Sequence, residues 1–319
     1  MKYRDFDRQD LDFSLDKKLH NCDRGKDRPN ATTETAAVVL SLVVGTINRV
    51  QEVDRLFASL AKQHNSEFEV ILVDQNQDDR LVALVAYYRS FFSINHLRSL
   101  PGLSRSRNIG LLQCRGDFIA FPDDDCWYPE DAIDRVIAAF RAAADVDIVC
   151  GRTLDKDGAE SLGKFQKFSS EITRSNVWRT HNSSTLFVRA CALQGIYNFD
   201  ESLGLGAKSQ FQSGEETDLL LQLLQRGKRA QFCRDLIIRH DQMIETVSVM
   251  LKRAKLYSPG FGRVLRKHNF GFPYLIYRLV LTCGGALLAL LRMNPAQARY
   301  KIIWAFGTIQ GYFAKPSLS

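Results

Sequence analysis

The sequence predicts an α/β protein with a Rossmann-like, doubly wound sheet, in which helices cover both faces of the strands. Strand-like and helix-like segments alternate from residue 36 to residue 150. The strand-like segments are nearly continuous apolar runs, as expected for parallel strands that are buried on both faces. Polar residues follow three of these strands, at Asn48, Asp74 and Asp123–Asp125. Because ligands of such sheets bind at the carboxyl ends of the strands, this edge is the predicted binding site.

The elements of the sheet follow in a regular order. A buried strand is predicted at 37–44, and an apolar stripe predicts a helix over 50–60. The other predicted elements are, in order, a strand at 69–74, a helix at 79–89, a strand at 94–97, a helix at 105–112, a strand that ends at Phe121, a helix at 129–144 that opens at Pro129, and a strand at 147–150. We therefore expect residues 36–150 to form one sheet-containing subdomain.

The alternation stops after residue 150, and residues 151–245 predict a second, less regular subdomain. It includes a short strand at 185–188 and a leucine-rich helix that ends at Gly227. Residues 1–35 are a polar extension of mixed charge without an apolar signal core, so we expect a chain that is not secreted. The seven cysteines are scattered, odd in number and form no Cys-x-x-Cys pair, which argues against a disulfide framework or a zinc knuckle and favours a reducing compartment.

Residues 246–319 carry the basic character of the chain. This tail contains eleven Lys or Arg residues and no Asp or Glu, whereas the whole chain has a net charge of +7. Its apolar stretches, 279–291 and 302–314, are each shorter than the ~20 residues that span a bilayer. We expect a helical tail that associates with an anionic membrane surface, and a helical pair packed on the catalytic domain is the alternative. The tail is too apolar for a nucleic-acid-binding segment, so no nucleic-acid partner is expected.

Three consecutive aspartates, Asp123, Asp124 and Asp125, follow the fourth predicted strand. Carboxylates held this close repel one another and need a cation. Mg²⁺ or Mn²⁺ binds one or two such groups and completes its shell with water and substrate phosphates. The motif therefore predicts a divalent metal site. The alternative is a solvated acidic turn before the next helix, where Glu130 and Asp131 favour the positive helix end.

A second acidic cluster opens the leucine-rich helix. Ser213 and Glu216 fit the Ser-x-x-Glu capping box, and Glu215 and Asp218 favour the positive end of the helix. The functional alternative is that one of these carboxylates takes a proton from an incoming hydroxyl as a general base. His240 follows a short apolar run, and it is either a structural residue or a ligand of Mn²⁺.

Five short motifs occur in a fixed order between residues 36 and 245. They are Gly45-Thr46-Ile47-Asn48-Arg49, Val73-Asp74, Ser104-Arg105-Ser106-Arg107-Asn108-Ile109-Gly110, Phe121-Pro122-Asp123-Asp124-Asp125 and Gly214-Glu215-Glu216-Thr217-Asp218-Leu219. Together they resemble the family 2 glycosyltransferases. The resemblance implies a GT-A fold and an inverting, metal-dependent transfer of a sugar from a nucleotide-diphosphate donor to a hydroxyl. Gly45, Ile47 and the run Gln75-Asn76-Gln77 depart from the family pattern, so the resemblance does not identify the donor.

The resemblance also implies roles for individual residues. Contacts with the base, the ribose and the rest of the donor are implied for Thr46, Asn48, Arg49, Asp74, Arg105, Arg107, Asn108, Asp123 and Asp124. Metal binding is implied for Asp125, with Asp123 as its partner in the Asp-x-Asp pair and His240 as a further ligand. Glu216 occupies the position of the catalytic base, and Glu215 is its substitute.

These implied properties complete the functional prediction. The expected donor is a nucleotide sugar, the expected acceptor is a glycan or lipid-linked molecule of cell-surface polysaccharide assembly, and the expected cofactor is Mg²⁺ or Mn²⁺. We expect a cytoplasmic protein that associates peripherally with the inner face of the cell membrane. The alternative is a catalytically inactive, membrane-associated scaffold that binds nucleotide sugars. A nucleotidyltransferase is excluded because the segment 45–49 is too short and glycine-poor to cradle a triphosphate.

Overall fold

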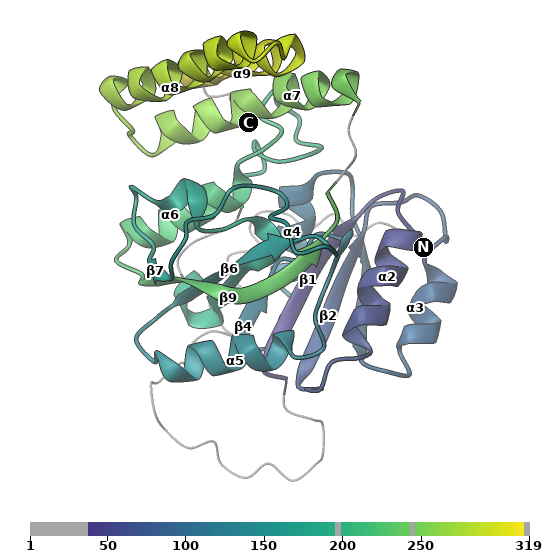
Figure 1. Cartoon of the computed structure of the whole chain (residues 1–319). Coiled ribbons are helices and arrows are strands. Elements are labelled where there is room, and N and C mark those ends of the chain that lie inside the picture. The colour runs from purple at the N-terminus through teal and green to yellow at the C-terminus, as the bar shows by residue number, and fades with distance from the viewer. Residues whose placement is uncertain (1–37, 195–198, 243–245, 316–319) are drawn as a thin grey trace. The chain divides into compact units, whose positions relative to one another are not determined.

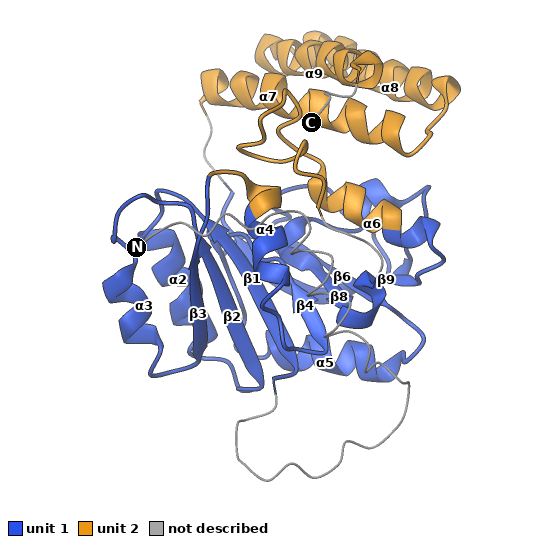
Figure 2. Cartoon of the chain, turned by 180° about the vertical axis from the view of Figure 1, so that it is seen from behind, with its two compact units in different colours: residues 1–100, 106–198, 223–242 blue, residues 101–105, 199–222, 243–319 orange. Residues whose placement is uncertain are grey.

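The computed structural model describes residues 38–194, 199–242 and 246–315. The polar extension predicted for residues 1–35 lies outside these ranges. The chain forms two compact units, which Figure 2 colours separately. Unit 1 comprises residues 1–100, 106–198 and 223–242, and unit 2 comprises residues 101–105, 199–222 and 243–319. The functional subdomains predicted for 36–150, 151–245 and 246–319 stay predictions.

The first four strands of unit 1 are parallel to their neighbours and have the spatial order β3-β2-β1-β4. Figure 1 labels β2, β1 and β4, and Figure 2 labels all four. These strands are β1 (Leu40–Thr46), β2 (Phe68–Asp74), β3 (Ser93–Arg98) and β4 (Phe118–Ala120). Thr46 pairs with Asp74, and Asp74 pairs with Arg98, so the carboxyl ends of three strands meet at one edge. The predicted convergence of these strand ends is confirmed.

The rest of the sheet is mixed, so the parallel arrangement predicted for residues 36–150 holds only for the first four strands. β8 lies between β4 and β6 and is antiparallel to both, whereas β9 runs parallel to β6. The described residues between β6 and β8 contain no α-helix, and an antiparallel strand needs no long crossover connection. These strands are β5 (Cys126–Trp127), β6 (Ile148–Leu154), β7 (Ser170–Glu171), β8 (Leu186–Arg189) and β9 (Ala230–His240).

Helices cover both faces of this sheet, as predicted. The helices that pack on it are α2 (Gln51–Leu60), α3 (Val82–Tyr88), α4 (Leu103–Leu111) and α5 (Ala132–Ala142). Leu42 belongs to a hydrophobic core that also contains buried side chains of α2, α3 and α5. Its neighbour Val43 points to the opposite face, where a Cβ added to Gly110 of α4 would overlap its side chain. Only glycine therefore lets α4 approach β1 this closely.

α5 is shorter than its predicted range. The Pro129 carbonyl accepts a hydrogen bond from the Ala132 N–H (2.9 Å), which closes a turn ahead of the helix. α5 then begins at Ala132, so Pro129 precedes the helix and does not open it.

Unit 2 contains three long C-terminal helices. They are α7 (Val247–Lys267), α8 (Phe272–Leu291) and α9 (Pro295–Phe313), and α9 packs along both others. α8 has 20 residues and contains an 18-residue window with a mean hydropathy of 1.8, so it is long and apolar enough to cross a membrane by length and composition alone. The apolar stretch 279–291 is the second part of α8, which begins at Phe272, and whether the tail lies on a membrane stays a prediction.

Candidate active site

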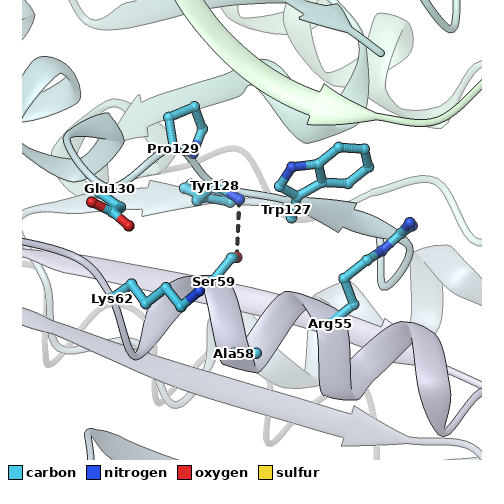
Figure 3. Close-up of a pocket in the computed structure, with 8 residues that line it drawn as sticks. All are labelled: Arg55, Ala58, Ser59, Lys62, Trp127, Tyr128, Pro129 and Glu130. Atoms are coloured by element: carbon cyan, nitrogen blue, oxygen red, sulfur yellow. Dashed lines mark hydrogen bonds between the residues drawn. The ribbon is translucent and has the colours of Figure 1, made fainter. Parts of the chain in front are cut away.

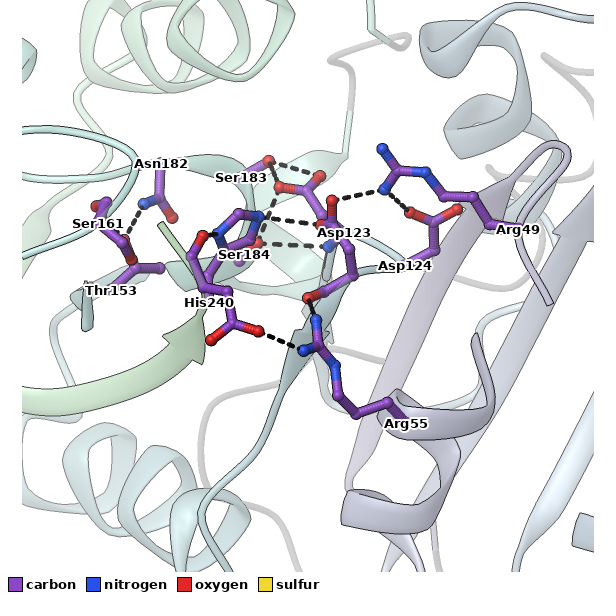
Figure 4. Close-up of polar contacts among 12 residues, drawn as sticks. Arg49, Arg55, Asp123, Asp124, Thr153, Ser161, Asn182, Ser183, Ser184 and His240 are labelled. Atoms are coloured by element: carbon purple, nitrogen blue, oxygen red, sulfur yellow. Dashed lines mark hydrogen bonds and ion pairs between the residues drawn. The ribbon is translucent and has the colours of Figure 1, made fainter. Parts of the chain in front are cut away.

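The polar residues after β1 and β4 meet at the carboxyl edge of the sheet. The Thr46 hydroxyl donates to Asp124 Oδ2 (2.7 Å). Arg49 Nη1 bridges two aspartates, with 2.7 Å to Asp124 Oδ1 (Figure 4) and 2.5 Å to Asp125 Oδ2. The structure therefore brings together four residues that the sequence places in two motifs.

The two aspartates that Arg49 bridges differ in proton affinity. Burial raises the pKa of Asp124 to about 6, although Arg49 and Thr46 act in the opposite direction. Burial also opposes ionisation of Asp125, but His240 and Arg49 outweigh it and lower the pKa of Asp125 to about 2. Asp125 is therefore the carboxylate of this pair that stays ionised throughout the neutral range.

Asp125 is paired with His240, which lies 115 residues away in the sequence. His240 Nε2 lies 3.1 Å from Asp125 Oδ1, and both side chains are largely buried. The pairing of β5 with β9 sets this distance, because it places Cys126 directly opposite His240. The Nδ1 atom lies 2.6 Å from the Asp241 carbonyl, which fixes the plane of the ring.

A carboxylate and an imidazole are donors that Mn²⁺ accepts, so Asp125 and His240 fit a divalent cation. Within the described ranges, no three His, Cys, Asp or Glu side chains are grouped to hold a metal. The third predicted ligand, Asp123, contacts other partners. A cation at this pair would therefore complete its shell with water and substrate oxygens, as Mg²⁺ commonly does.

Asp123 is held by two hydroxyls and a guanidinium. Ser183 Oγ lies 2.9 Å from both carboxylate oxygens, and Ser184 Oγ lies 2.9 Å from Oδ2 (Figure 4). Arg107 Nη2, on a side chain that is only 1% exposed, lies 3.2 Å from Oδ1. Sequence reasoning missed Ser183 and Ser184, because two hydroxyls in an irregular segment carry no signal of their own.

Asp74 is a supporting residue of the site. Its side chain is fully buried, and its Oδ2 lies 3.0 Å from both His96 Nε2 and Arg98 Nη1. Its Oδ1 accepts hydrogen bonds from the backbone and the side chain of Asn76. Asn76 Oδ1 in turn accepts the Asn48 N–H (2.7 Å), and Asn48 has a left-handed φ of 59°. Asp74 therefore orders the segment that carries Asn48.

The predicted donor-binding residues of α4 fall into both units. Arg105 belongs to unit 2, where its Nε lies 3.1 Å from Glu201. Arg107 and Asn108 belong to unit 1 and are almost fully buried. The structure thus brings Arg107 to the first of the aspartates after β4, Asp123.

The acidic cluster of unit 2 lies at the start of α6 (Glu215–Gln225). Gly214 is the N-cap, since its carbonyl accepts the Asp218 N–H (2.8 Å) and its φ is +91°. The capping box that the sequence predicts for Ser213 and Glu216 stays a prediction. The Ser213 hydroxyl donates to the Tyr257 carbonyl (2.8 Å).

Burial separates the three acids of this cluster. Asp218 is fully buried, with Lys267 Nζ at 2.8 Å and His268 Nε2 at 2.7 Å. Glu215 is 5% exposed, whereas Glu216 is in part open to solvent. Glu216 is therefore the member of this cluster that a substrate reaches most easily.

Comparison with known proteins adds independent evidence. Residues 41–195 match the model of a protein family, "Glycosyl transferase family 2". An uncharacterized glycosyltransferase of Haemophilus influenzae is 39% identical over 95 residues, which are 29% of this chain and 31% of that protein. TarS, a poly(ribitol-phosphate) beta-N-acetylglucosaminyltransferase of Staphylococcus aureus, is 31% identical over 142 residues, which are 43% of this chain and 25% of TarS. The chain thus covers less than a third of the length of either relative.

Solved structures extend the similarity to most of the chain. Residues 1–349 of TarS in complex with UDP-GlcNAc superpose with a TM-score of 0.56 at 17% identity, over 87% of this chain and 93% of that one. A mannosyltransferase of Pyrobaculum calidifontis in complex with GDP-Man and Mn²⁺ superposes with a TM-score of 0.60 at 14% identity, over 96% and 94% of the two chains. These likenesses establish the fold that the three proteins share.

Proposed function

Because this chain belongs to glycosyl transferase family 2, we propose that it transfers a sugar from a nucleotide-diphosphate donor to a hydroxyl of a glycan or lipid-linked acceptor. The observation that carries the proposal is the Asp125–His240 pair, with Arg49 beside it, at the carboxyl edge of the parallel strands. A pair of oxygen and nitrogen donors next to a guanidinium suits a metal-bound diphosphate.

The donor would lie along the ends of β1 and β2. Asn48 and Arg49 directly follow β1, and the Asp74–Asn76 contacts hold this segment in place for the base and the ribose. Arg49 is 39% exposed, so its guanidinium can exchange an aspartate for a phosphate oxygen. Asp123 would meet the ribose or the sugar, with its carboxylate oriented in advance by Ser183 and Ser184.

Asp125 and His240 would hold Mg²⁺ or Mn²⁺. The cation, when bound, would neutralise the charge that develops on the departing diphosphate. Glu216 would take the proton of the acceptor hydroxyl, which attacks the anomeric carbon from the side opposite the diphosphate and so inverts its configuration. Glu215 is the substitute base, but its burial makes it the less accessible of the two.

Calorimetric titration with UDP-, GDP- and dTDP-sugars, each with and without Mn²⁺, tests this function. We expect one nucleotide class to bind, and its affinity to depend on the metal, because the diphosphate and Asp125 would share the cation. The control is the same titration with the free nucleoside, which lacks the diphosphate. Binding of none of these donors by the folded protein would contradict the enzymatic function and favour a catalytically inactive scaffold.

We also propose that α8 binds the inner face of the cell membrane. Its exposed apolar side chains include Val280, Leu287 and Leu291, which are 62%, 60% and 73% exposed. Arg278 and Arg292 lie on or directly after the same helix, and such cations favour an anionic lipid surface. Apolar side chains flanked by cations are typical of interfacial helices.

Replacing Leu287, Leu288 and Leu291 with Ser in the full chain is expected to move the protein from the membrane to the soluble fraction. Burying three such side chains favours binding enough that their loss should weaken vesicle partition by more than about tenfold. Flotation with vesicles that contain anionic lipid measures this. The matched control replaces three exposed apolar residues of unit 1, Val82, Tyr87 and Phe91. Equal flotation of both variants and the wild type would remove α8 from the membrane proposal.

A further inference from the structure

Arg55 of α2 contacts both segments that carry the Asp125–His240 pair. Its Nη2 donates to the backbone carbonyl of Asp125 (2.5 Å), and its Nη1 donates to Asp241 Oδ2 (2.5 Å). Asp241 directly follows His240, and its carbonyl is the group that lies 2.6 Å from His240 Nδ1. The Arg55 guanidinium thus contacts the backbone of Asp125 and the side chain of Asp241, the residue that follows His240.

A third contact fixes the plane of this guanidinium. Arg55 Cζ lies 4.5 Å from the ring centroid of Trp127, which belongs to β5. Both side chains line a groove of about 400 Å³ between α2 and the segment 127–130. Ser59 and Lys62 also line it (Figure 3). Stacking on the indole leaves the edge of the guanidinium directed at its two oxygen partners.

These contacts of Arg55 serve to position Asp125 and His240 and contribute little to the stability of the fold. The Arg55 and Asp241 side chains are 41% and 46% exposed, and exposed ion pairs contribute little to the stability of a protein. The geometry, in contrast, constrains Asp125, which precedes β5, and His240, which ends β9, and a cation needs these two groups at a fixed separation. Partners that orient metal ligands in this way tune metal affinity by about 10- to 100-fold.

We propose that Arg55 is a positioning residue that sets the separation and orientation of Asp125 and His240. The inference rests on the proposed function in so far as this pair holds the metal. Asp241 acts with Arg55, because its carboxylate is the anchor of the guanidinium and its carbonyl is the anchor of the imidazole. Arg55 contacts the backbone carbonyl of Asp125 and the carboxylate of Asp241, so its effect on the pair passes through the main chain.

Calorimetric titration with Mn²⁺ alone compares the full-length wild type with Arg55→Ala, Arg55→Lys and Asp241→Asn. We expect Arg55→Ala to weaken Mn²⁺ binding by about 10- to 100-fold with an unchanged Tm. The Mn²⁺ affinity of Arg55→Lys should lie between those of the wild type and Arg55→Ala, because lysine keeps the positive charge but lacks the planar guanidinium. The matched control is Arg135→Ala, which removes another exposed arginine paired with an aspartate, Asp131. Mn²⁺ affinity of Arg55→Ala within twofold of the wild type would overturn the proposal.

A second measurement needs no metal and separates this proposal from the proposed function. In histidine-labelled protein, the ring resonances of His240, assigned with His240→Gln, should shift or broaden in Arg55→Ala and Asp241→Asn but not in Arg135→Ala. If the wild type binds no Mn²⁺ and these resonances still respond, the metal site fails while the positioning role stands. Resonances that do not respond to Arg55→Ala would overturn the positioning role.

Discussion

Replacing Glu216 with Gln is expected to lower the rate of sugar transfer by about 100-fold or more, which is the usual contribution of a general base. The amide has nearly the shape of the carboxylate but cannot accept a proton. Glu216 lies at the start of α6 and, unlike Glu215 and Asp218, is not buried. The substitution should therefore change the chemical step and leave the fold and donor binding intact.

Two measurements check this expectation. Initial rates at saturating donor report transfer, and calorimetric titration with the same donor reports binding. The control is Glu215→Gln, which changes a buried carboxylate of the same helical turn. Normal transfer by Glu216→Gln, together with lost transfer by Glu215→Gln, would assign the base to Glu215 instead.

Replacing Asp125 with Ala is expected to weaken Mn²⁺-dependent donor binding by at least about 100-fold, the upper end of the effect of outer-shell partners. The substitution removes one of the two donors of the proposed cation site and leaves His240 without its carboxylate partner. The substitution also removes one of the two carboxylates that Arg49 contacts, whereas the ion pair of Arg49 with Asp124 remains. Donor binding without metal should change less, because its other contacts persist.

Titration of the donor into Asp125→Ala at several Mn²⁺ concentrations measures this loss. Asp131→Ala is the control, since it removes an exposed carboxylate that is paired with Arg135 outside the site. Retained metal dependence in Asp125→Ala, with its loss in Asp123→Ala, would transfer the ligand role to Asp123. The hydroxyls of Ser183 and Ser184 would then have to release that carboxylate.

Local patterns determined the strands and most of the helices of unit 1. The apolar runs before Thr46 and Asp74 identified β1 and β2, because a strand buried on both faces has apolar side chains at nearly every position. The aspartates after β4 were found for the same reason, since a polar cluster that follows a buried strand must emerge at the sheet edge. Helix ends were less accurate, as for α5, because a turn can precede the first helical residue.

The tertiary structure alone decided which of these residues meet. The sequence by itself determined the α/β class, the strand ends and the acidic clusters, since propensity and periodicity act over a few residues. The antiparallel insertion of β8, the hydroxyls on Asp123 and the contact of His240 with Asp125 arise from strand pairing between distant segments. The same holds for Arg55, which is an ordinary helical arginine until β5 and β9 are packed beside α2. Such contacts depend on the register of strands far apart in the chain, and no local pattern records that register.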